Sequence, residues 1–215
     1  MTPSRFPDPR EAPGDQPLGY GGDLAPETLL DAYGHGIFPW PDADGTLWWW
    51  SPDPRAVLPL DGFHVSRSLR RTLRAGRFTL TVDHAFTSVV RACADRPEGT
   101  WIVPAYARAF QRMHELGHAH SVEAWDAEGR LAGGVYGLAL GGAFFAESMF
   151  HRATDASKVA LFHLVQRLRD GGFTLLDVQL PTPHLASLGA VTISREDYLD
   201  RLTDALGRSG TTFAR

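Results

Sequence analysis

Hydrophobic positions follow regular spacings over most of the chain. Apolar residues return every three or four positions in four segments, which predicts amphipathic helices over 26–38, 85–95, 104–117 and 155–170. Other segments alternate between apolar and polar positions or are rich in apolar and β-branched residues. These segments predict strands over 78–83, 120–125, 130–140, 143–150 and 173–180.

The connections between the strands indicate how they pair. Residues 126–129 (DAEG) and Gly141–Gly142 are typical hairpin turns, so the three strands that they join should form an antiparallel meander. The helix over 155–170 joins the third of these strands to the strand over 173–180, which predicts parallel pairing and a right-handed crossover. The expected fold class is α+β. The order β-β-β-α-β is that of a GNAT-like mixed β-sheet with helices, the core pattern of the N-acetyltransferase (GNAT) superfamily.

The N-terminal part of the sequence has a different character. Residues 1–22 are rich in proline, glycine and aspartate, which predicts an irregular arm, and residues 38–60 are too dense in tryptophan and proline for a long regular element. We expect a small Trp/Pro-rich N-terminal domain over 1–62 and a GNAT-like catalytic domain over 63–215. Four of the six tryptophans lie in the N-terminal part: Trp40, Trp48, Trp49 and Trp50. They either fill a small core or offer a surface to a flat ring such as a nucleobase.

Positive charge is concentrated locally, although the net charge of −4 excludes a generally basic, polyanion-binding chain. A predicted basic helix at 66–77 contains five arginines and no acid: Arg67, Arg70, Arg71, Arg74 and Arg77. Such a run is either a solvated helix face or a patch that contacts phosphates. No apolar stretch is long enough to cross a bilayer, and the first residues lack an apolar signal core. We therefore expect a cytoplasmic protein without a membrane partner.

Residues 114–118 read His-Glu-Leu-Gly-His, which matches the H-E-x-x-H pattern of zinc peptidases. That site needs both histidines on one face of a continuous helix. Gly117 is typical of the left-handed residue that ends a helix, which would put His118 in the turn before the next strand. The single cysteine, Cys93, cannot supply a cysteine-based zinc site. We therefore expect no metal site.

Polar side chains interrupt two predicted strands near their carboxyl ends. Glu147 lies in the third meander strand, on the same face as Met149 by simple alternation, and Asp177 and Gln179 lie in the last strand. Carboxylates on a sheet covered by helices are costly to bury unless they are paired or line a cleft. These side chains form either a structural network or a ligand site at the edge where parallel strands end.

A series of short motifs occurs in a fixed order from about residue 18 to 202. The motifs are GGDL (21–24), GIFPW (36–40), WWSPDPRAVL (49–58), SRSLRR (66–71), GTWI (99–102), HELGHAHSVE (114–123), GGVYG (133–137), ESMF (147–150), ASK (156–158), DVQ (177–179) and HLASLGA (184–190). In this order they resemble the leucyl/phenylalanyl-tRNA–protein transferases. The resemblance implies an aminoacyltransferase that moves Leu, Phe or, less readily, Met from aminoacyl-tRNA to the α-amine of proteins with N-terminal Arg or Lys. It implies a tag for N-end rule degradation, no cofactor and no metal, and we expect a monomer.

The resemblance also implies a role for individual residues. Gln179 would orient the attacking amine, Asp177 would polarise Gln179, and Glu147 would either hold the donor or attract the acceptor's cationic side chain. Three aromatic residues would stack on the 3′ adenosine of the tRNA: Trp40, Trp101 and Phe144. An apolar pocket for the aminoacyl side chain would be formed by Val135, Met149, Leu161, Leu164 and Leu176. The tRNA backbone would contact Arg67, Arg70, Arg71 and Arg74.

Two other functions are compatible with parts of this pattern. An acetyl-CoA-dependent N-acetyltransferase needs a glycine-rich loop before the helix that follows the meander, so that backbone N–H groups bind pyrophosphate. The corresponding segment 150–158 (FHRATDASK) contains no glycine. A non-catalytic tRNA-binding module would explain the arginines, but the pairing of Asp177 with Gln179 favours an enzyme.

Overall fold

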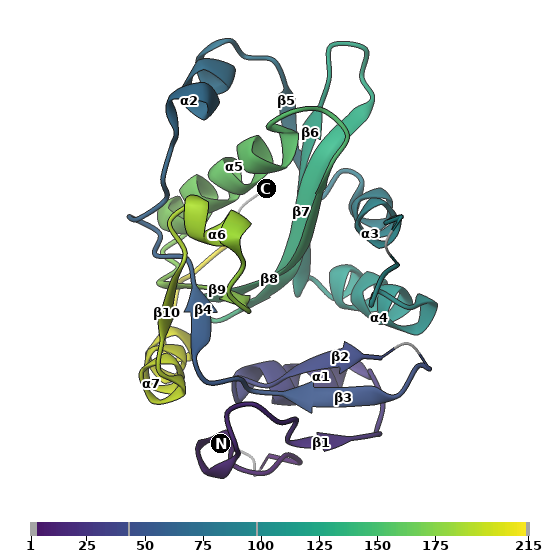
Figure 1. Cartoon of the computed structure of the whole chain (residues 1–215), viewed down its shortest axis with the longest axis vertical. Helices are drawn as coiled ribbons and strands as arrows, with labels where there is room; N and C mark the ends of the chain where they lie inside the picture. The colour runs from purple at the N-terminus through teal and green to yellow at the C-terminus, as the bar shows by residue number, and fades with distance from the viewer. Residues whose placement is uncertain (1–3, 43, 98, 214–215) are drawn as a thin grey trace.

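The computed structural model describes residues 4–42, 44–97 and 99–213. Over these residues the chain forms a large mixed sheet with helices on both faces, and a small N-terminal unit packs beside it (Figure 1). The predicted α+β class is confirmed. The strands of the large sheet are, in spatial order, β10 (Val191–Ile193), β4 (Arg55–Val57), β9 (Leu175–Gln179), β8 (Ala143–His151), β7 (Leu131–Leu140), β6 (Ala119–Trp125) and β5 (Thr79–Val82).

The predicted meander and crossover are both present. β6, β7 and β8 pair antiparallel in sequence order. The helix α5 then leads to β9, which pairs parallel with β8. The turn glycines Gly129 and Gly141 have φ of 74° and 54°, a region that glycine enters without strain. The GNAT-like order β-β-β-α-β is therefore confirmed. It could be predicted from the sequence because the glycines of the hairpin turns mark where each strand ends.

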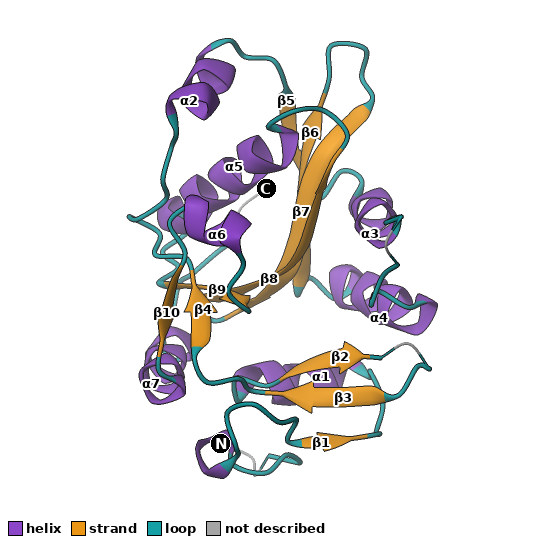
Figure 2. Cartoon of the chain, in the orientation of Figure 1, coloured by secondary structure: helices purple, strands orange, loops and turns teal. Residues whose placement is uncertain are grey.

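Helices cover the two faces of the large sheet as separate layers (Figure 2). α5 packs on one face, where its apolar stripe joins a buried cluster with residues of β4, β6, β7, β8 and β9. α3 and α4 pack on the opposite face and contribute to a second buried cluster. The helices are α1 (Pro26–Gly34), α2 (Arg67–Arg74), α3 (Phe86–Ala94), α4 (Pro104–Glu115), α5 (Ala156–Asp170), α6 (Pro183–Ser187) and α7 (Arg195–Leu206).

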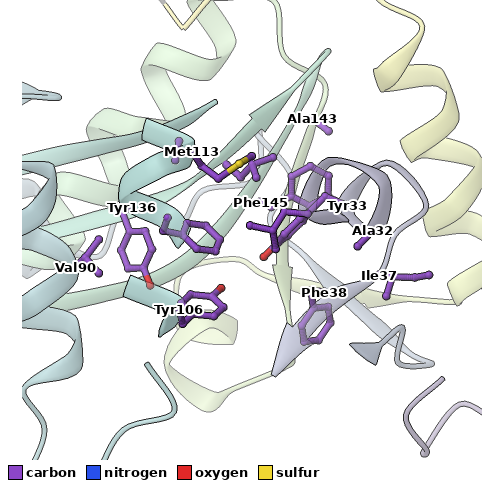
Figure 3. Packing of buried hydrophobic residues seen from close by; sticks show 14 of the residues in the cluster. Ala32, Tyr33, Ile37, Phe38, Val90, Tyr106, Met113, Tyr136, Ala143 and Phe145 are labelled. Atoms are coloured by element: carbon purple, nitrogen blue, oxygen red, sulfur yellow. The ribbon is translucent and has the colours of Figure 1, made fainter. Parts of the chain in front are cut away.

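The N-terminal unit contains more regular secondary structure than the irregular arm and the Trp/Pro-rich segment predicted from the sequence. Its elements are a 3-10 turn (Pro9–Glu11), the strands β1 (Gly19–Tyr20), β2 (Phe38–Pro41) and β3 (Leu47–Trp50), and α1. Figure 3 shows Tyr33 of α1 beside Phe145 of β8, and Ile37, Phe38 and Tyr106 of α4 belong to the same buried cluster. The unit therefore shares a hydrophobic core with the large sheet.

β4 links the N-terminal unit to the large sheet. Its three residues lie between β9 and β10 and pair antiparallel with both. Two prolines precede β4, at 52 and 54, and its length is below that of an ordinary strand, so the sequence pattern did not reveal it. The chain that leaves the N-terminal unit thus enters the large sheet directly, as the strand next to the edge strand β10.

The segment 114–118 forms a helix end followed by a strand. α4 ends at Glu115, Gly117 has φ of 81°, and the His118 N–H donates to the Met113 carbonyl, as in a Schellman motif. In the described part of the chain, no three His, Cys, Asp or Glu side chains are grouped in a way that could hold a metal ion. Burial raises the pKa of the Cys93 thiol to about 12, which keeps it protonated.

A β-bulge in β8 changes the direction of the side chains that follow it. Gly137 pairs with Ala146, whereas the preceding Tyr136 pairs with Ser148, so Glu147 is the extra residue. The prediction that Glu147 and Met149 share one face is therefore wrong. Glu147 points toward the tyrosines of α1 and α4, and Met149 packs with the cluster under α5.

Candidate functional site

A cleft of about 720 Å³, which we call the main cleft, opens where β8 and β9 separate. The two strands are paired only as far as Phe145 and Asp177. Two residues further along each strand, Glu147 and Gln179 reach the cleft. Other walls come from the first half of α5, the segment after β9, the end of α3 with the residues that follow it, and the side chains of Trp40 and Trp101. The end of strand pairing thus creates a cleft with a polar end inside a largely apolar surface.

Glu147 is the most strongly perturbed carboxyl group that lines the main cleft. Its carboxylate accepts hydrogen bonds from the hydroxyls of Tyr33 (2.8 Å) and Tyr106, and from Nε2 of Gln179 (3.2 Å). Burial raises the pKa of Glu147 to about 7, against the effect of the two tyrosine hydroxyls. Burial also raises the pKa of both tyrosines well above 10, so they remain donors. Glu147 therefore changes charge near neutral pH at the surface of the cleft.

Gln179 ends β9 in an uncommon backbone conformation. Its φ is 57°, in the left-handed region that costs a non-glycine residue about 1–3 kcal/mol. The Asp177 carboxylate accepts a hydrogen bond from the Gln179 backbone N–H at 2.8 Å, which stabilises this conformation. Because Nε2 of Gln179 donates to Glu147, the amide oxygen of Gln179 is left to accept a hydrogen bond from a ligand.

Asp177 is buried behind the main cleft rather than in it. It forms a two-point ion pair with Arg55, from Nε to Oδ1 (3.0 Å) and from Nη2 to Oδ2 (2.6 Å), and both side chains are 0% exposed. The Tyr198 hydroxyl of α7 donates to Oδ2 at 2.8 Å. Nη1 of Arg55 donates to the carbonyl of Gly36 at 3.0 Å. We expected Asp177 to polarise the Gln179 amide, but its contact is with the Gln179 backbone.

The predicted aromatic residues occupy two different environments. Trp40 and Trp101 line the main cleft and stack on each other, with ring centroids 4.7 Å apart. Phe144 is buried on the α5 side of the sheet, where its ring stacks on Phe213. The two tryptophans are therefore placed for contact with a ligand, whereas Phe144 is buried and does not line the main cleft.

The predicted apolar pocket residues form two shells around the same region. Val135, Met149 and Leu161 line the main cleft. Leu164 and Leu176 belong to the same buried cluster but lie behind that surface. An apolar side chain that entered the cleft would thus contact Val135, Met149 and Leu161. Leu164 and Leu176 would pack behind these residues and limit their movement.

Within the basic segment 66–77, α2 covers residues 67–74 and leaves Arg77 outside the helix, and its arginines at 67, 70, 71 and 74 are all exposed. The buried side of α2 faces α5, where the Thr72 hydroxyl donates to Oδ2 of Asp155 at 2.9 Å. Asp155 immediately precedes α5, whose first turns supply Ser157 and Leu161 to the main cleft. α2 is therefore fastened beside the cleft with its charged side directed to solvent.

The sequence did not single out the partners that hold the site. Arg55, Tyr33, Tyr106 and Tyr198 come from four separate segments, and each contacts its carboxylate over a long sequence separation. Nothing in the sequence SPDPRAVL distinguishes Arg55 from an ordinary surface arginine. The sequence indicated its role only indirectly, because a buried Asp177 requires a cationic partner from elsewhere in the chain.

In the described residues, no helix is both long enough and apolar enough to cross a membrane. This finding agrees with the sequence, which contains no apolar stretch of the required length.

Comparison with known proteins assigns the family. Residues 22–53 match the family model described as the leucyl/phenylalanyl-tRNA protein transferase N-terminal domain, and residues 57–203 match the model described as leucyl/phenylalanyl-tRNA protein transferase. Residues 54–56, which include the first two residues of β4, lie between the two matched ranges.

Curated relatives agree over nearly the whole chain. The leucyl/phenylalanyl-tRNA–protein transferase of Nitratidesulfovibrio vulgaris (strain DP4) is 53% identical over 204 residues, covering 93% of this chain and 87% of the relative. That of Anaeromyxobacter sp. (strain Fw109-5) is 54% identical over 207 residues, covering 94% and 88%. Among solved structures, L-PGS from Bacillus licheniformis has a TM-score of 0.42 and 16% identity, covering 74% of this chain and 52% of the other. From the family models and these curated relatives, the chain belongs to the leucyl/phenylalanyl-tRNA–protein transferase family.

Proposed function

We propose that the protein is an aminoacyltransferase that moves Leu or Phe, and less readily Met, from aminoacyl-tRNA to the α-amine of proteins that begin with Arg or Lys. The observation that carries the proposal is the main cleft, where Glu147 and Gln179 adjoin an apolar wall and a tryptophan pair. Family membership supplies the reaction class. In this proposal the enzyme acts as a cytoplasmic monomer without metal or cofactor and marks its acceptors for N-end rule degradation.

The aminoacyl-tRNA would bind through three kinds of contact. The terminal adenosine would stack on an outer face of the Trp40–Trp101 pair, a contact that contributes about 1–3 kcal/mol. Val135, Met149 and Leu161 would contact the aminoacyl side chain. The α2 arginines would contact phosphates of the acceptor stem, which gives affinity without sequence readout.

The reaction is the aminolysis of an ester. The nitrogen of the acceptor α-amine forms a bond to the carbonyl carbon, the bond to the ribose oxygen breaks, and a proton passes from the amine to that oxygen. Free α-amines have a pKa near 7.7–8.0, so about a tenth to a fifth of them are already neutral at pH 7. The enzyme therefore mainly has to position the amine and accept its proton.

The polar end of the cleft fits these two tasks. The free amide oxygen of Gln179 would accept a hydrogen bond from the amine and fix its direction of attack. Glu147, whose pKa is about 7, would accept the proton in its ionised form and release it to the ribose oxygen. Asp177, already paired with Arg55, would keep Gln179 in its left-handed conformation.

The direct test is transfer of radiolabelled phenylalanine from Phe-tRNA to a peptide with an N-terminal arginine. We expect a product with phenylalanine at its N-terminus, and we expect Gln179→Ala to lower the single-turnover rate by about 10²-fold because the amine loses its orienting acceptor. Gln166→Ala, on the outer part of α5, is the matched control and should behave as wild type. Full activity of Gln179→Ala would contradict the assignment, and no product with the wild-type enzyme would contradict the function.

The pKa of Glu147 predicts a pH effect on stability. Because the folded protein holds this proton up to about pH 7 and the unfolded chain releases it near pH 4.5, the folded state loses stability as the pH rises between these values. Glu147→Gln removes the effect. When the pH is raised from 5 to 8, the free energy of unfolding of Glu147→Gln, measured in urea, should increase by about 1–3 kcal/mol relative to that of wild type. Glu115→Gln, an exposed control, should show no such gain, and parallel pH profiles for Glu147→Gln and wild type would contradict the raised pKa.

The α2 arginines predict a salt dependence of tRNA binding. If four arginines neutralise phosphates, the logarithm of the association constant should fall with the logarithm of salt concentration at a slope of about −3 to −4. The double variant Arg70→Ala, Arg74→Ala should have a slope that is less negative by about 2, whereas Arg201→Ala, at an exposed position, should leave the slope unchanged. Filter binding at several salt concentrations measures the slope, and a wild-type slope near zero would refute the phosphate contacts.

A further inference from the structure

A second hollow adjoins the main cleft, and we call it the side pocket. Its volume is about 410 Å³, and its walls include Phe38, Trp40 and Trp50. Trp40 and Leu180 line both the side pocket and the main cleft, so the two spaces are neighbours. Leu180 follows Gln179 directly and is 39% exposed at this boundary. A molecule held at Gln179 could therefore extend into the side pocket without crossing the protein core.

The N-terminal arm forms the outer wall of the side pocket and is fastened there. The buried Arg195 guanidinium donates to the carbonyls of Ala12 and, at 2.9 Å, of Ser51. The Asp53 N–H donates to the carbonyl of Gly14 at 3.1 Å. A Cβ atom on Gly14 would lie 2.9 Å from Cβ of Asp53, so only glycine allows this close approach. The arm is thus held in place by specific contacts at the pocket.

Two exposed carboxylates lie among these aromatic walls. Asp15 and Asp53 both line the side pocket. Within the part of the chain that the structure describes, neither has an ion-pair partner. Asp53 accepts from the Arg195 backbone N–H through Oδ1 only, which leaves Oδ2 available. Aromatic faces and carboxylates together favour a cation on an apolar stem, and they disfavour a phosphate.

We propose that the side pocket binds the cationic side chain of the acceptor's first residue, an N-terminal Arg or Lys. This inference rests on the proposed function, since it places the α-amine at Gln179 and the side chain across Trp40 and Leu180. The methylene stem would lie on the aromatic walls, and Asp15 and Asp53 would receive the guanidinium or ammonium group. Glu147 is less suited to this task, because three donors already contact its carboxylate and its charge is incomplete at neutral pH.

A pair of matched acceptors tests the site. Peptides that begin with arginine or with citrulline, a neutral analogue of nearly the same shape, are compared in transfer from Phe-tRNA. For the wild type we expect kcat/KM to be at least tenfold higher with arginine, mainly through KM. In Asp15→Asn with Asp53→Asn this ratio should fall to within about twofold of one, while the KM for Phe-tRNA stays unchanged. Asparagine at 53 retains an oxygen for the Arg195 N–H, so the wall should stay in place.

The outcomes separate the site from the function. Asp170→Asn, an exposed control at the far end of α5, should keep the wild-type ratio. A double variant that keeps the wild-type preference for arginine would overturn the side pocket as the recognition site while leaving the transferase function intact. If the wild type transfers to neither peptide, the proposed function fails, and argininamide binding then decides the pocket by itself. Tryptophan fluorescence should respond to argininamide in the wild type and much less in the double variant, and equal responses would overturn the proposal.

Discussion

The buried ion pair between Arg55 and Asp177 is the contact on which the arrangement of the site depends. An unpaired charge at either position would be strongly destabilising, by about 3–5 kcal/mol, so β4 and β9 must lie side by side. The same guanidinium binds the Gly36 carbonyl after α1, and the same carboxylate binds Tyr198 of α7. The N-terminal unit, the sheet edge and the last helix are thereby joined at one point. Asp177 also accepts a hydrogen bond from the Gln179 backbone N–H. The ion pair therefore fixes the position of the Gln179 side chain, which lines the main cleft.

The main cleft follows from two local departures from a regular sheet. β8 and β9 separate after Phe145 and Asp177, and the bulge in β8 lets Glu147 face two tyrosines while Met149 faces α5. One short stretch of β8 therefore supplies both a titratable group and an apolar wall. The bond between Thr72 and Asp155 adds a basic helix beside the same opening. In the proposed function, these features bring an apolar aminoacyl group, a nucleobase and an amine to one place.

Most of the fold was readable from the sequence because it depends on local signals. Helix periodicity, hairpin turns and the helix-ending Gly117 all act over a few residues, and the meander, the crossover and the end of α4 are confirmed. The sequence pattern did not predict β4, because a strand of three residues flanked by prolines is too short to show a hydrophobic periodicity. Strand alternation placed Met149 wrongly because a bulge leaves no mark in an apolar pattern. Glu147 and Gln179, which the sequence pattern placed near the ends of neighbouring strands, both line the main cleft, but their partners could not be predicted, since Arg55 meets Asp177 across 122 positions of sequence.

A double-mutant cycle on the ion pair tests the central claim most directly. Free energies of unfolding in urea are measured for wild type, Arg55→Met, Asp177→Asn and the double variant. Each single variant should lose about 3–5 kcal/mol, because it leaves one buried charged or polar partner unsatisfied. The double variant should lose little more than either single variant, which corresponds to a coupling energy of about 3 kcal/mol or more. Additive losses, with a coupling energy near zero, would contradict the claim that this pair joins the two parts of the molecule.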